Sequence, residues 1–185
     1  MNDVIKTILE RRSVRSYKPD AIPAGDLELI VKAGLYAPSA NNQQPWHISV
    51  VRNAALMDSI EDEIRAVCLA EGGGLGERAK KPEFRIFYNA PAIVLVSGET
   101  ANVHNEIDSA NVAENIALAA WSLGLGSCII KMGNIVFRGG RAAEFKTKLG
   151  VPDGYQPNVW VALGNAAYVA PNAPQRRADT VNYVD

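Results

Sequence analysis

Apolar residues recur every three or four positions in three early stretches of the chain, which is the spacing of the buried face of an amphipathic helix. The first stretch follows Asn2 or Asp3, either of which can cap a helix, the second begins near Asp26, and the third follows Asn53. The sequence therefore predicts three helices in its first part. Their apolar faces consist of Val4, Ile5, Ile8 and Leu9, of Leu27, Ile30, Val31 and Leu35, and of Met57, Ile60, Ile64 and Val67.

A fourth helix is expected from Ile107 to Leu123, where the chain is rich in alanine and mostly apolar and then stops at Gly124. Such a composition is typical of a largely buried helix. It could pack under the sheet of its own chain, or its small residues could admit a helix of a second subunit. The pattern leaves both interpretations open. A narrow polar stripe follows one side of this helix at Asp108, Asn111, Asn115 and Ser122.

Short apolar runs predict strands at Ile48–Val51, Ala92–Val96 and Asn158–Gly164. The run Ala92–Val96 is apolar on both faces, as expected for a central strand. A further strand should lie within Gly124–Lys131, whose glycines permit positive φ and expose backbone amides. Helices and strands therefore both contribute to the expected core.

Two segments fit neither pattern. Glu71–Gly76 is rich in glycine, but no strand leads into it and no Gly-Lys-Ser/Thr follows, so we interpret it as a mobile loop rather than a phosphate-binding loop. The tail from Ala170 carries two prolines, and its last residues alternate like an edge strand. We expect a single domain over residues 1–185, in which residues 170–185 form an extended C-terminal arm.

The composition excludes several classes of protein. The chain has 19 Lys and Arg against 20 Asp and Glu, so no global basic field is present to bind nucleic acid, and any anion site must be local. Cys68 and Cys128 match neither a disulfide framework nor a metal-ligand pattern, which indicates buried free thiols in a reducing compartment. The apolar runs are shorter than the ~18 residues of a membrane span, and the start lacks a signal-peptide core. We therefore expect a cytoplasmic protein with no membrane partner.

The segment Ala37–His47 is unusually dense in side-chain hydrogen-bonding groups. It places one serine and four carboxamides between two prolines, and these groups offer both donors and acceptors. They suit a ligand whose edge carries ring nitrogens and carbonyls. Alternatively, Ser39 caps a turn and the amides are solvated.

Arginines alternate with small hydroxyl residues in the segment Arg11–Tyr17. The planar guanidinium group binds phosphate through paired, charge-assisted hydrogen bonds, and serine adds a compact donor. The pattern therefore favours a phosphate site. It is equally typical of a charged helix end, where cations complement the helix dipole.

Taken together, these motifs resemble those of the flavin-dependent nitroreductase family. The resemblance implies an α+β fold with a mostly antiparallel central sheet flanked by helices. It also implies an intertwined homodimer that holds two FMN molecules at its interface. The matching segments follow the order of the family along nearly the whole chain and are Arg11–Tyr17, Ala37–Trp46, Leu118–Ala120 leading into Gly124–Cys128, Leu163–Gly164 and Arg176–Arg177.

The resemblance assigns the cofactor phosphate to residues from both ends of the chain. Arg11, Ser13 and Arg15 would take the FMN phosphate and ribityl chain. Arg177 from the tail would close over the phosphate, and Arg12 would approach the isoalloxazine edge.

Further cofactor contacts are implied near the flavin ring. Ile129, Ile130 and Lys131 would run beside the ring, and an amide there, such as that of Lys131, would donate to flavin N5. The partner subunit would contribute the loop residues Pro38, Ser39, Ala40 and Asn42.

The implied activity is that of an FMN-dependent NAD(P)H oxidoreductase. NADH or NADPH would pass a hydride to flavin N5 and leave, and a nitroaromatic, quinone or similar flat acceptor would then take the electrons in a ping-pong cycle. We assign no catalytic side chain and no metal, because the cofactor carries the chemistry, and we interpret His47 and His104 as structural or exposed. The alternatives are a specialised flavoenzyme of the same fold (a dehalogenase, azoline oxidase or flavin-cleaving enzyme) or a flavin-binding redox-sensing module without turnover.

The sequence departs from the family pattern in three places. Ala40 stands where the family often has a second hydroxyl residue, so only backbone contact is expected there. The segment between Val51 and Ala92 leaves little length for the helices that often roof the substrate pocket. Residues 78–83 offer no clear counterpart of the polar side chain that commonly contacts the pyrimidine edge of the flavin.

Overall fold

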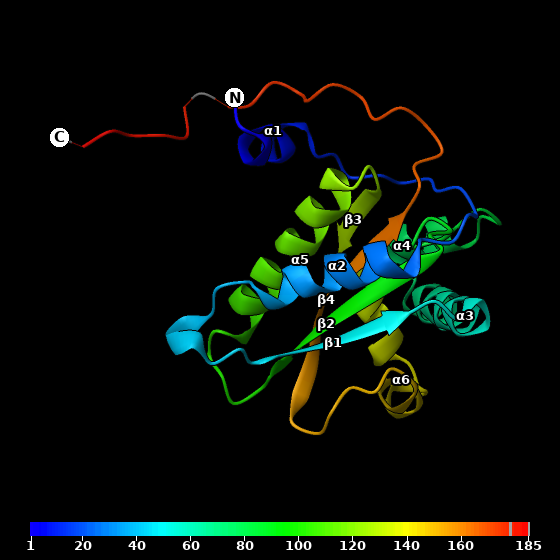
Figure 1. Ribbon diagram of the computed structural model, residues 1–185. Coiled ribbons are helices and arrows are strands. Elements are labelled where there is room, and N and C mark those ends of the chain that lie inside the picture. The colour runs from blue at the N-terminus through cyan, green and yellow to red at the C-terminus, as the bar shows by residue number, and fades with distance from the viewer. Residues whose placement is uncertain (178, 185) are drawn as a thin grey trace.

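The computed structural model describes residues 1–177 and 179–184. In this part of the chain four strands form one antiparallel sheet in the order β1, β2, β4, β3 (Figure 1). All the predicted strands are present, and β2 lies between β1 and β4, as its two apolar faces indicated. The strands are β1 (Trp46–Val51), β2 (Ala92–Glu99), β3 (Gly126–Ile130) and β4 (Tyr155–Gly164).

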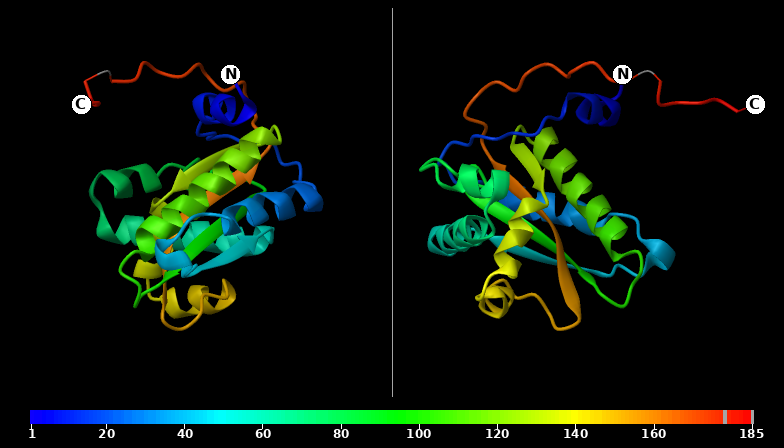
Figure 2. Two further views of the ribbon diagram at one scale, coloured as in Figure 1. Left: turned by 60° about the vertical axis from the view of Figure 1, so that its left-hand side comes forward. Right: turned by 180° about the vertical axis from the view of Figure 1, so that it is seen from behind.

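Helices cover both faces of the sheet (Figures 1 and 2). Val94 and Val96 of β2 belong to a core with α2 (Ala24–Leu35) and α5 (Asn105–Ser122) on one face. Ile93 and Leu95 point the other way, because side chains alternate along a strand. They belong to a second core, which is formed with α3 (Ala54–Glu71), the 3-10 helix η2 (Met132–Arg138) and α6 (Ala142–Lys148).

The predicted helix starts and the predicted buried helix are confirmed. The side-chain oxygen of Asn2 accepts the amide of Ile5 at 3.0 Å at the start of α1 (Asp3–Glu10), and Asn53 caps α3 in the same way. Helix α5 packs under the sheet of its own chain through apolar residues that include Ile116, which is fully buried. It stops at Gly124, whose φ is +76°.

The prediction of a mobile loop at Glu71–Gly76 is wrong. Helix α3 continues to Glu71, Gly72 turns the chain at a φ of +70°, and α4 (Gly73–Ala79) follows at once. A Cβ atom on Gly76 would lie 2.8 Å from the carbonyl oxygen of Cys68. Glycine here therefore lets α4 pack directly against α3.

The N-terminal segment joins the outer edge of the sheet. Ser13 forms a parallel bridge with Ser127 of β3, and Tyr17 forms an antiparallel bridge with Ala166. The described part of the chain after residue 170 runs past α1 and away from the body of the molecule (Figures 1 and 2). Within residues 1–177 and 179–184, the helices are all too short or too polar to cross a membrane.

Candidate functional site

The arginine-rich segment lies along the free edge of β3. The amide of Val14 donates to the carbonyl of Ser127 at 2.8 Å, and the Val14 side chain is buried in the core. Because side chains alternate along extended backbone, Ser13 and Arg15 face away from that core. The amide of Arg15 donates to the hydroxyl of Tyr168 at 3.1 Å. No sequence pattern pointed to Tyr168, whose hydroxyl comes from the C-terminal part of the chain.

Three of the predicted phosphate-binding residues follow one another along the segment that borders β3. Burial raises the pKa of the Cys128 thiol, while the charges of Arg15 and Arg11 and a hydrogen bond from Ser13 oppose that rise. The guanidinium group of Arg11 is also 3.5 Å from the carboxylate of Glu114. Two guanidinium groups and a hydroxyl therefore form a local positive site on a chain with no net positive charge.

The Arg12 side chain is held by hydrogen bonds, but one of its donor groups has no partner in the described part of the chain. Its Nη1 donates to the carbonyl oxygens of Leu9 and Arg11 at 2.8 and 2.6 Å. Its Nε is buried and has no hydrogen-bond partner among the described residues. A buried donor without a partner costs about 1–3 kcal/mol, so this N–H favours a ligand with an acceptor on that side.

The strand beside these arginines offers backbone groups to a ligand. The carbonyl of Ser127 faces the outer edge of β3, since it accepts from Val14 there. Backbone groups alternate along a strand, so those of Ile129 face the same edge. Lys131 lies just past the end of β3, and its carbonyl accepts the Asn134 amide at 3.1 Å, so only its own amide is left for a ligand. The Ile130 side chain is buried in the core, and by the same alternation its backbone groups face β4, so its cofactor contact remains a prediction.

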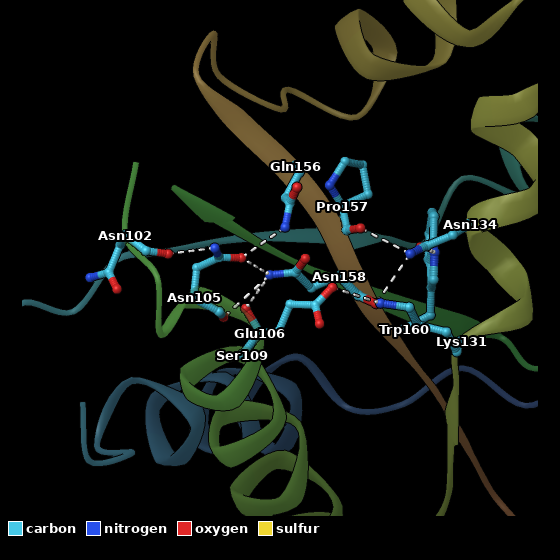
Figure 3. Close-up of polar contacts among 10 residues, drawn as sticks. All are labelled: Asn102, Asn105, Glu106, Ser109, Lys131, Asn134, Gln156, Pro157, Asn158 and Trp160. Carbon is cyan, nitrogen blue, oxygen red and sulfur yellow. Dashed lines mark hydrogen bonds and ion pairs between the residues drawn. The ribbon is translucent and has the colours of Figure 1, made fainter. Parts of the chain in front are cut away.

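A buried polar network fixes the chain just after β3 (Figure 3). Nδ2 of Asn134 in η2 donates to the carbonyls of Pro157 and Asn158 at 2.9 and 3.1 Å, and its Oδ1 accepts Nε1 of Trp160 at 2.8 Å. Nζ of Lys131 lies 3.5 Å from a Glu106 oxygen in α5. The backbone at Lys131 and Met132 is therefore held from both β4 and α5.

The amide loop adopts a strained conformation. Asn41, Asn42 and Gln44 all have positive φ, between 50° and 53°, a region that residues other than glycine occupy at a cost. The amide of Gln44 donates to the Ser39 hydroxyl at 2.9 Å, so Ser39 does close a turn. Positive φ in three nearby residues is typical of functional loops.

The two groups of predicted cofactor residues lie apart within one chain. The loop with Pro38, Ser39, Ala40 and Asn42 lies at the N-terminal end of α5, and the carbonyl of Pro38 accepts Nδ2 of Asn111 at 3.3 Å. Helix α1 lies toward the other end of α5 (Figures 1 and 2), and Arg11 after it reaches Glu114 near the middle of α5. This separation is what a site completed by a second subunit requires.

Arg177 is also apart from the other arginines. It lies in the exposed arm, where its guanidinium group bonds the carboxylate of Asp179 at 2.9 Å. Its predicted role over the phosphate remains a prediction.

The structure adds a residue that sequence reasoning missed. Arg78, near the end of α4, lines a groove of about 550 Å³ together with Lys131 and Met132. Sequence reasoning found no residue for the pyrimidine edge in residues 78–83, because it did not place a helix over Gly73–Ala79. Arg78 becomes a candidate for that contact through α4.

Comparisons with known proteins agree with this geometry. The nitroreductase family model matches residues 8–165. A protein of Archaeoglobus fulgidus described as an NADH dehydrogenase/NAD(P)H nitroreductase is 30% identical over 169 residues, which are 89% of this chain and 86% of the relative. A nitroreductase with bound FMN from Bacteroides fragilis is 34% identical, both chains are covered in full, and the TM-score is 0.93. An FMN-bound nitroreductase from Desulfitobacterium hafniense gives the same three values.

The family match spans the arginine segment, the amide loop, β3 and all of β4. The observed α+β fold, with its antiparallel sheet between helices, is the fold that the sequence motifs implied. The chain therefore belongs to the nitroreductase family.

Proposed function

We propose that this protein is an FMN-dependent oxidoreductase that takes a hydride from NADH or NADPH and reduces a nitroaromatic, quinone or similar flat acceptor in a ping-pong cycle. The observation that carries the proposal is the set of donors beside β3. Arg11, Ser13 and Arg15 follow one another along the segment that borders β3, and the buried Nε of Arg12 has no partner among the described residues. These donors fit a ligand with a phosphate at one end and ring acceptors at the other.

The protein's own residues bind and orient in this proposal. Arg11, Ser13 and Arg15 hold the phosphate and ribityl chain, with Arg177 closing over the phosphate, and Arg12 offers its Nε to the ring edge. The outward backbone at Ile129 and Lys131 lies beside the ring, and Arg78 faces its pyrimidine edge. When bound, FMN supplies the redox chemistry. Cations and N–H groups around it stabilise the negative charge that it acquires on reduction.

A homodimer completes this site, with Pro38, Ser39, Ala40 and Asn42 coming from the second copy. Every residue of α1 is exposed or half-buried. Its Val4, Ile8 and Leu9 leave large apolar areas uncovered, and Tyr36 next to the amide loop is 78% exposed. Exposed apolar surface of this kind marks protein interaction sites. The extended arm, with exposed Val181, Tyr183 and Val184, fits the same interface.

The test of the proposed function is spectroscopic. Purified protein supplied with FMN should be yellow, and anaerobic addition of NADH or NADPH should bleach it before a flat acceptor restores the colour. A colourless protein that takes up no FMN would contradict the proposal. If the protein binds FMN but NADH and NADPH reduce it at a negligible rate, the result would instead support a redox-sensing module.

The phosphate assignment predicts weaker FMN retention in two variants. Arg15→Ala and Arg177→Ala each leave phosphate charge less well compensated, and each should raise the Kd for FMN by about tenfold or more. Fluorescence titration of the apoprotein with FMN measures this change. Lys146→Ala, which removes an exposed cation from α6, is the charge control. Unchanged affinity in both arginine variants would remove the phosphate assignment.

A further inference from the structure

A second pocket lies at the edge of the sheet opposite β3. It has a volume of about 370 Å³, within the range of small-molecule sites. Its walls come from the loop Pro19–Ala21, the first turns of α3 and the segment Arg85–Pro91, and Arg52 stands at its rim, directly after β1. Because β1 and β3 are the two opposite edges of the sheet, this pocket is separate from the proposed FMN site.

The lining of this pocket combines an apolar body with a few charged groups. Met57, Phe87 and Pro91 supply apolar surface, and the Phe87 ring is itself fixed against Trp160 at a centroid distance of 5.2 Å. Arg52, Asp58, Glu61 and Arg85 bring charge to the same walls. Pockets of this composition bind small molecules by burying an apolar part and orienting a polar one.

The negative charges in the pocket already have partners. Both carboxylate oxygens of the buried Glu61 accept backbone amides, from Ile86 at 2.9 Å and from Phe87 at 2.8 Å. The carboxylate of Asp58 is 3.5 Å from the guanidinium group of Arg85. Neither acid therefore needs a cationic ligand.

One positively charged side chain of the pocket has no partner among the residues that the structure describes. In the described part of the chain, Arg52 makes no ion pair and its side chain makes no hydrogen bond. The N-terminus of α3 lines the same pocket through Ala54, and the helix dipole places partial positive charge there. The Asn53 side chain already accepts the Leu56 amide at this helix start, so Arg52 is the group left to bind an anion.

We propose that this pocket binds a small monocarboxylate with an apolar or aromatic body. The carboxylate lies at Arg52, beside the start of α3, and the body lies on Met57 and Pro91. A single negative charge fits better than a phosphate dianion, because the carboxylates of Asp58 and Glu61 repel a second charge and a bare phosphate leaves the apolar wall uncovered. This inference does not depend on the proposed oxidoreductase activity.

The test is an NMR titration of the FMN-saturated full chain with benzoate, followed through the backbone amides. We expect saturable shifts in residues 53–57 and 85–89. Arg52→Gln should weaken the binding by about tenfold, and Lys146→Gln should leave it unchanged. Ala54→Leu, which keeps every charge and narrows the pocket, should also abolish the shifts.

Three outcomes would overturn the proposal. Shifts confined to residues 129–132 would place benzoate at the flavin face instead. If Arg52→Gln bound benzoate as tightly as the native chain, Arg52 would not be the anion-binding group. If inorganic phosphate bound as tightly as benzoate, the site would not be specific for monocarboxylates with an apolar body. Arg52 is exposed, so its replacement leaves the fold intact and keeps the comparison clear.

Discussion

Asn158→Asp should lower the free energy of unfolding by about 3–5 kcal/mol at neutral pH, because it places an uncompensated charge in the core. Asn158 is 2% exposed, and its Nδ2 donates to the carbonyl and Oδ1 of Asn105 and to Oγ of Ser109, at 3.2, 2.8 and 2.9 Å. Figure 3 shows this amide pointing at the start of α5. Aspartate offers only acceptors to the two Asn105 oxygens, and of the three partners only the Ser109 hydroxyl can reverse its bond and donate. The effect should appear as a lower midpoint in urea denaturation.

The pH dependence of this variant gives a second check. Burial raises the pKa of the new carboxyl in the folded state above its value in the unfolded chain. Between these two pKa values the carboxyl is protonated in the folded state and ionised in the unfolded state. The free energy of unfolding of the variant therefore falls as pH rises through this range. The stability difference from the native chain should therefore be smallest at acidic pH. Asn172→Asp, in the exposed arm, is the matched control and should change little.

The secondary structure was largely accessible from the sequence, because it depends on local patterns. The cap at Asn53 and the apolar run Ala92–Val96 each carry their signal within a few residues. The polar network around Asn158 carries no such signal, since its partners in α5 lie about fifty residues earlier in the chain. Asp108, expected on a polar stripe, is only 3% exposed. Which polar groups are buried depends on tertiary packing that periodicity does not encode.

The glycine-rich segment shows a limit of propensity arguments. Glycine disfavours helix by about 1 kcal/mol relative to alanine, and on that ground Glu71–Gly76 was expected to be a loop. Tertiary contact with α3 overrides that preference, because Gly76 lies where a Cβ would meet the Cys68 carbonyl. The same misassignment hid Arg78, which α4 brings to the groove beside Lys131.

The sequence placed Arg11, Ser13 and Arg15 in one stretch, and the structure sets that stretch along the edge of β3. Their role at the FMN phosphate remains a prediction from the family resemblance. The contribution of Tyr168, which reaches Arg15 from the C-terminal part of the chain, could not be predicted from spacing. The part of the site assigned to a second copy has to be tested in solution, because its residues lie apart from these arginines within one chain.

Arg65→Met should destabilise the protein by about 2–4 kcal/mol and loosen the segment from Ala79 to Phe84. The guanidinium group of Arg65 donates to four carbonyls of that segment. Hydrogen bonds to charged groups contribute about 1.5–3 kcal/mol each, but in the variant water can bind the more exposed carbonyls, so the total loss is smaller than the sum. It also lies 5.4 Å from the centroid of the Phe84 ring. The four carbonyls belong to Ala79, Lys81, Pro82 and Phe84, at 2.5, 2.8, 3.2 and 2.9 Å.

Hydrogen exchange locates this effect and urea denaturation measures its size. Amides of residues 79–84 should exchange faster in Arg65→Met, and Arg65→Lys should give an intermediate result, because a single ammonium cannot match the planar fork of arginine. Arg138→Met removes an exposed guanidinium that pairs with Glu71, and as a surface pair it should cost less than about 1 kcal/mol. If Arg65→Met matched Arg138→Met in both measurements, Arg65 would not organise this segment. If Arg65→Met behaves as expected, the order of residues 79–84, which follow Arg78, depends on the Arg65 side chain of α3. The affinity for FMN should then fall in Arg65→Met as well.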